Sequence, residues 1–182
     1  MKRIAILFAA LVMGLTATKA QYVDEFSKAA RAIEKTWSQK KLKVGKEFQT
    51  TKVRAFAKAF ASAYPQYKPC ANLLKYLSNP AAYDPGKADY SINDAPRNGY
   101  ILSDMAWQFD HLVEVCYWKR SNGHSLVGVV IRLGFEGEGV NDITVPMFYD
   151  YNPQTSIMTP DLAVTNTVKQ LVRKFKGNTS IY

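Results

Sequence analysis

The sequence is poor in the residues and motifs that mark common enzymes. Its 182 residues include only two cysteines and two histidines. It lacks the short His and Cys spacings of zinc sites, the His-Glu-x-x-His and Gly-x-Ser-x-Gly signatures of hydrolases, and a phosphate-binding glycine loop. We therefore expect no catalytic residue, no metal site and no cofactor.

Long apolar runs are also missing beyond the first fifteen residues. Residues 4–15 form an unbroken apolar run, shorter than the roughly 20 residues that span a bilayer. Lys2 and Arg3 precede this run, and a small-x-small site that ends at Ala20 follows it. These three parts are typical of a secretory signal peptide over residues 1–20, although an N-terminal membrane anchor or a buried helix is an alternative.

Removal of the signal before Gln21 would leave one domain over residues 21–182, a length that suits a single core. We expect this mature protein to be periplasmic or secreted. It should not span a membrane once the signal is cleaved. The sequence does not predict its oligomeric state.

The positive charge is uneven along the chain. The formal net charge is +9. Residues 21–79 hold twelve Lys or Arg and four acids, whereas residues 80–182 hold nine Lys or Arg and eleven acids. The densest basic run, residues 40–46, could meet anionic glycans, lipid headgroups or acidic proteins, or simply form a solvated loop between helices. Nucleic acid is not an expected partner, because the chain has no nucleic-acid motif and is predicted to be exported.

Three N-terminal segments carry apolar residues every three or four positions, as amphipathic helices do. They cover residues 22–38, residues 51–64, and a third segment from Pro69 to about Asn79. Residues 79–98 follow without clear periodicity. A loop of this length is often functional or contains a short strand.

From Gly99 onward the apolar period changes to two, which indicates strands. The predicted strands cover residues 100–109 (with a break near Asp104), 111–120, 125–135, 143–151 and 156–159. Asn122-Gly123 readily adopts the positive φ angles of a tight hairpin turn. Pro146 cannot donate to a ladder, so its strand should lie at an edge or contain a bulge. Pro160 and Asp161 begin a last helix.

The predicted fold is therefore α+β, with three N-terminal helices, an antiparallel meander of four to five strands and a C-terminal helix. The helices should cover at least one face of the sheet, because their apolar stripes have no other partner. Residues 111–120 are apolar on both faces. We expect this strand to be central and partly covered on both sides.

The two cysteines, Cys70 and Cys116, could form a disulfide in an oxidising compartment. The bridge would tie the third helix to the central strand and stabilise the fold by roughly 4 kcal/mol. Two buried free thiols are the alternative. A third hypothesis pairs Cys116 with His111 as a catalytic dyad.

Aromatic side chains are plentiful on the predicted strands. The candidate binding residues are Tyr100, Trp107, Tyr117, Trp118, Tyr149 and Tyr151, with Arg120 near them. Such rings on a sheet face can stack on sugars or grip a peptide, or they can pack beneath the helices.

Several strand-turn signatures resemble those of exported, uncharacterised proteins of Bacteroidetes bacteria. They are the run 148–155 with Met158-Thr159-Pro160, the segment Asn98-Gly99-Tyr100, and the turn Lys119-Arg120-Ser121-Asn122-Gly123. The resemblance covers roughly residues 98–160 and implies a periplasmic or surface location, but no catalytic residue. A cone of the NTF2-like kind is another possible fold, although here three helices precede every clear strand.

The leading hypothesis is a small, non-catalytic, exported binding or accessory protein whose partner is a glycan, a peptide or an envelope protein. One alternative is an envelope hydrolase that uses a carboxylate pair or Cys116 with His111. The acids close enough in sequence for such a pair are Asp104, Asp110, Glu114, Glu136 and Glu138. The other alternative is a structural subunit of an envelope assembly.

Overall fold

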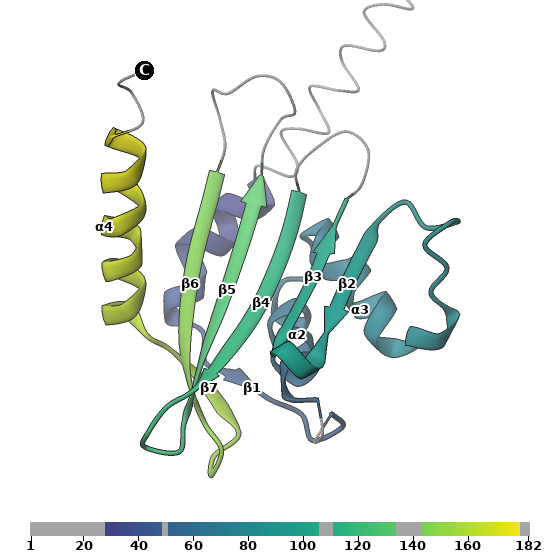
Figure 1. Cartoon of the computed structure of the whole chain (residues 1–182), viewed down its shortest axis with the longest axis horizontal. Coiled ribbons are helices and arrows are strands. Elements are labelled where there is room, and N and C mark those ends of the chain that lie inside the picture. Colours follow the sequence, from purple (N-terminus) through teal and green to yellow (C-terminus); the bar gives the residue numbers. More distant parts are fainter. Residues whose placement is uncertain (1–27, 49–50, 106–110, 134–142, 179–182) are drawn as a thin grey trace, which may run out of the picture.

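The computed structural model describes residues 28–48, 51–105, 111–133 and 143–178, with side chains described as far as Leu171 (Figure 1). The predicted signal peptide lies outside these residues, as do Trp107, Asp110, Glu136 and Glu138.

Helices form where the apolar period predicted them. The elements are a helical segment over residues 28–36, the 3-10 turn η1 (Trp37–Gln39), α2 (Lys52–Ala63), α3 (Lys68–Ser78), η2 (Pro80–Ala82), η3 (Pro96–Asn98) and α4 (Leu162–Asn178). The apolar stripe of α2 is buried as expected, through Val53, Phe56, Ala57, Phe60 and Ala61. The predicted α+β class, with N-terminal helices, an antiparallel sheet and a C-terminal helix, is confirmed.

The strands form one antiparallel sheet in the order β1-β7-β6-β5-β4-β3-β2. Their bounds are β1 (Leu42–Lys43), β2 (Ser91–Ala95), β3 (Tyr100–Asp104), β4 (His111–Lys119), β5 (Ser125–Leu133), β6 (Ile143–Asn152) and β7 (Ile157–Pro160). From β2 to β7 each strand pairs with the next, so the predicted meander is present. Gly123, with φ 83°, makes the tight turn between β4 and β5.

The sheet has seven strands rather than the predicted four to five. The two additional strands, β1 and β2, lie at its edges and have few apolar residues. Short edge strands take their position from a partner strand, so they leave little periodicity in the sequence.

One face of the sheet packs against the helices. Figure 1 shows the segment 28–36, α2 and α3 behind the strands. The strand residues on this side are almost completely buried: Ile101, Val113, Val115, Val127, Val129, Ile131, Val145, Met147 and Tyr149. Strand β4 is central as predicted. The expected cover on its other face is not provided by any described helix (Figure 1).

Helix α4 lies beside β6 in the position of a further strand (Figure 1). On β6, strand β7 pairs only with residues 149–152, and beyond β7 the chain turns into α4. The Phe148 carbonyl accepts from the Asp161 amide at 2.7 Å, and the Phe148 amide donates to Thr165 Oγ1 at 3.0 Å. The helix therefore shields an edge that would otherwise be unpaired. Pro146 lies in the part of β6 that pairs only with β5, so it occupies a local edge, although β6 as a whole is an interior strand rather than the predicted edge strand.

Candidate functional site

The sheet face that points away from the helices is here called the outer face. It is made of the alternate residues of β3 to β6. The apolar residues on it are Tyr100, Leu102, Leu112, Cys116, Trp118, Leu126, Val130, Pro146 and Phe148. Pro146 is buried and most of the others are half-buried, but Trp118 is 51% exposed. The same face also carries Asp104, Glu114, Arg132, Thr144 and Asp150. A one-sided antiparallel sheet normally alternates apolar and polar residues, so the large apolar share of this outer face is unusual.

Gly128 allows the centre of the outer face to pack closely. It pairs with Cys116 on one side and Phe148 on the other. A Cβ at this position would lie 3.2 Å from Cys116 Sγ, from the Phe148 ring and from the Trp118 ring. The missing side chain therefore lets these three groups converge over β5.

A charged cluster lies where the β4–β5 hairpin meets the start of α4, and we call it the Arg120 cluster. Arg120 binds Asp150 at 2.5 Å and Asp161 at 2.6 Å, and His124 Nδ1 lies 2.6 Å from Asp150. Asp161 also accepts from the Val164 amide at 3.1 Å, as an N-cap does. Burial favours a higher pKa for Asp161, but Arg120 and the helix amides outweigh it and lower the pKa. Arg120, a predicted binding residue, is thus held by two carboxylates and joins the hairpin to α4.

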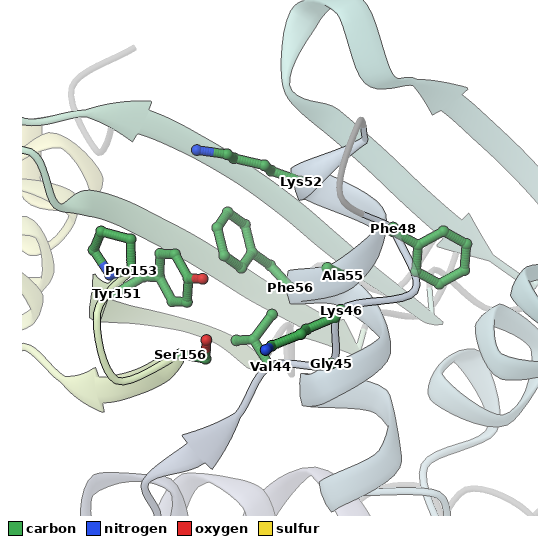
Figure 2. A pocket seen from close by; sticks show the side chains of 10 residues that line it. All are labelled: Val44, Gly45, Lys46, Phe48, Lys52, Ala55, Phe56, Tyr151, Pro153 and Ser156. Carbon is green, nitrogen blue, oxygen red and sulfur yellow. The ribbon is translucent and has the colours of Figure 1, made fainter.

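A hollow of about 210 Å³ opens at the junction of β1, α2 and the β6–β7 turn (Figure 2). We call it the basic hollow. Its lining residues are Val44, Gly45, Lys46, Phe48, Lys52, Ala55, Phe56, Tyr151, Pro153 and Ser156. The Tyr151 and Phe56 rings meet edge to face, 4.8 Å apart. The hollow therefore combines an aromatic wall with two lysines.

A second hollow of about 280 Å³ shares Gly45 with the first and is lined by Lys43, Glu47 and Lys58 among others. Glu47 binds Lys58 there at 2.7 Å. The Lys58 hydrogen bond is the main cause that lowers the pKa of Glu47. Glu47 is thus already paired with Lys58, and it lines the second hollow rather than the basic hollow.

The predicted aromatic binding residues separate onto two faces. Tyr100 and Trp118 lie on the outer face. Tyr117, Tyr149 and Tyr151 point toward the helices, where Tyr149 is fully buried and contacts Trp37 edge-on at 5.7 Å. Tyr151 also lines the basic hollow. The set therefore does not form one surface.

The predicted disulfide is wrong: both cysteines are free thiols. Cys70 is completely buried on the helix side of the sheet, whereas Cys116 is on the outer face beside Gly128. The sheet lies between them, so a bond would require rearrangement of the core. His111 is buried on the helix side, five positions from Cys116 along one strand. Because side chains alternate along a strand, this thiol and this imidazole lie on opposite faces.

Of the acids considered for a carboxylate pair, Asp104 and Glu114 are described. They lie on the outer face in diagonal register on β3 and β4. Neither lines one of the two hollows. Within residues 28–178, apart from the undescribed gaps, no three His, Cys, Asp or Glu side chains group as metal ligands would. None of the described helices has the length and apolar character needed to cross a bilayer.

The basic hollow was missed in the sequence because it depends on β1. Leu42 and Val44 alternate with lysines inside the basic run, a strand signal too short to distinguish an edge strand from a solvated loop. Leu42 pairs with Met158, and the Val44 amide donates to the Ser156 carbonyl at 2.9 Å. This pairing brings the basic run next to Tyr151.

Comparisons of the chain with protein-family models, with curated proteins and with solved structures find no match.

Proposed function

We propose that the chain is an exported, non-catalytic accessory protein that docks on another protein of the cell envelope through its outer face. The observation that carries this proposal is the group of apolar side chains around Trp118 on that face, whereas the strand residues on the helix side are buried under the helices. Contiguous apolar surface on a small domain is a common mark of a protein interface.

Trp118 is the anchor of the proposed interface. It is the most exposed large apolar side chain in the described part of the molecule. Trp is enriched among the residues that dominate binding energy, and such residues lie within apolar surroundings that exclude water. Leu126 and Cys116 supply those surroundings on the adjacent strand positions.

A protein partner fits this face better than a glycan. Sugar rings stack on aromatic side chains but also need polar groups beside them to bond their hydroxyls. Trp118 pairs with Leu126, whose other neighbour, Asp150, is already bound within the Arg120 cluster. Away from that cluster the face continues through Cys116 and Gly128 to Val130. Aliphatic positions favour the apolar side chains of another protein.

A periplasmic or surface location is part of the same proposal. The signal-like residues 1–20 and the resemblance of residues 98–160 to exported Bacteroidetes proteins both support a periplasmic or surface location. The lack of enzyme motifs, and the separation of Cys116 from His111 by the sheet, favour binding over catalysis.

The test is site-specific photo-cross-linking in the producing cells. A photoreactive residue replaces Trp118 in one variant and Lys87, an exposed residue of the α3–β2 connection, in the control. We expect position 118 alone to capture a discrete protein. The purified partner should then bind wild-type protein at least about tenfold more tightly than Trp118→Ala. Equal capture at both positions would contradict the proposal.

The same experiment distinguishes the structural-subunit alternative. Cross-links only between copies of this chain, from position 118, would favour self-assembly over an accessory role.

A further inference from the structure

We propose that the basic hollow binds a small anionic ligand with a flat apolar body, such as an aromatic carboxylate or an aromatic phosphate monoester. This inference does not depend on the proposed docking role. The hollow lies on the helix side of the sheet, because Tyr151 and Phe56 belong to the helix-side packing.

The size and walls of the hollow suit a small, flat molecule. Its volume of about 210 Å³ lies below the roughly 300–1,000 Å³ of sites that take drug-sized ligands. Phe56 is only 1% exposed and forms the bottom, and the half-buried Tyr151 ring forms a wall against it. Pro153 and Phe48 add apolar surface at the rim. An aromatic ring can lie against these groups without any being displaced.

The positive charge of the hollow favours an anionic ligand over a neutral one. Figure 2 shows Lys46 and Lys52 on two sides of the hollow, with the Phe56 and Tyr151 rings between them. No acid lines the hollow, and no acid among the described residues forms an ion pair with either lysine. Glu47, the acid nearest in sequence, is bound to Lys58. An incoming anion would therefore meet positive charge that no internal carboxylate has neutralised.

Neutral polar groups complete the site. The hydroxyl-bearing side chains of Tyr151 and Ser156 line the hollow and can donate to an anionic head group. Ser156 adopts a φ of 56° while its carbonyl accepts from Val44. The turn that carries Ser156 is thus fixed by β1, the same segment that leads to Lys46.

The test uses three probes of similar shape: phenylacetate, phenyl phosphate and the neutral phenylacetamide. Each is titrated into the purified chain, and binding is followed by NMR chemical-shift changes. We expect at least one anion to bind about tenfold more tightly than the amide, with shifts at Tyr151, Ser156 and the first turn of α2. Tighter binding of phenyl phosphate would assign a phosphate ligand, and tighter binding of phenylacetate would assign a carboxylate.

Charge-removing variants locate the site. Lys46→Gln and Lys52→Gln should each weaken the binding of the anion severalfold and leave the binding of phenylacetamide unchanged. Lys87→Gln, which removes an exposed lysine on the α3–β2 connection, should have no effect. The lysines of the hollow are exposed, so both variants should fold. Equal binding of all three probes, no binding at all, or anion binding that survives both substitutions would overturn the inference.

Discussion

At the scale of single residues, the environments of the two thiols can be tested directly. Burial raises the pKa of Cys116 to about 11, and complete burial raises the pKa of Cys70 further. The thiolate is the reactive form, so both cysteines should react slowly with a thiol reagent in the native protein at pH 8.

After unfolding in denaturant without a reducing agent, we expect two thiols per chain to react. The control is protein reduced before unfolding, which should give the same count. A count of zero that rises to two only after reduction would show that the disulfide forms after all.

Residue-level prediction worked where it depended on alternation. The buried faces of α2 and β4 follow from apolar residues that recur with periods of about 3.6 and 2, and these periods can be read directly from the sequence. The same alternation places His111 and Cys116 on opposite faces of β4, which the hypothesis of a catalytic dyad overlooked. The disulfide prediction was wrong because the sequence does not give the distance between a helix residue and a strand residue. It also does not show which side of the sheet the helix covers.

At the scale of elements, the edge strand β2 depends on one carboxylate. Asp94 accepts from Arg54 of α2 and from the Tyr76 hydroxyl of α3, each at 2.7 Å, and its side chain is only 6% exposed. These two bonds attach a mostly polar strand to the helical layer. The sequence could not predict this arrangement, because Asp94 lies far along the chain from both partners.

We expect Asp94→Ala to destabilise the protein by about 3 kcal/mol, because it leaves Arg54 and Tyr76 without their shared acceptor. The measurement is urea unfolding followed by circular dichroism. The matched control is Asp84→Ala, which removes a half-exposed carboxylate and should change stability by less than about 0.5 kcal/mol. Equal effects of the two substitutions would refute this role of Asp94.

The attachment of α4 should depend on pH through Asp161. Its folded-state pKa lies below the ordinary value, so its contribution is complete above about pH 4 and is lost as the pH falls through the lowered pKa. Asp161→Asn keeps a capping oxygen but removes the ion pair with Arg120. The stability difference between wild type and this variant should therefore be largest at neutral pH and shrink as the pH falls below about 4.

Asp161→Ala also removes the cap and should cost about 1 kcal/mol more than Asp161→Asn. A difference between wild type and Asp161→Asn that stays constant from pH 7 to pH 3 would contradict the role assigned to the ion pair.

At the scale of the whole molecule, the sequence predicted the class of fold and the meander, because long, periodic elements dominate both. It did not predict which face stays uncovered. That depends on α4, whose apolar periodicity suggested a covering helix. In the structure α4 lies beside β6 instead, fixed by backbone contacts of Phe148 that leave no periodicity in the sequence.

The proposed export of the protein is also tested on the whole chain. We expect the mature protein, isolated from the producing cells, to begin at Gln21 when it is analysed by N-terminal sequencing or intact mass. Material that begins at Met1 would instead indicate retention of the first segment, as in an N-terminal anchor.

The most direct test of the docking role is hydroxyl-radical footprinting of the isolated protein and of the protein in its native setting. Trp118 and Leu171 are about equally exposed, at 51% and 49%, but Leu171 lies on α4 and not on the outer face. We predict that both residues are oxidised in the isolated protein and that only Trp118 becomes protected in the native setting. Equal oxidation of Trp118 in both settings would contradict the claim that the outer face is a docking surface.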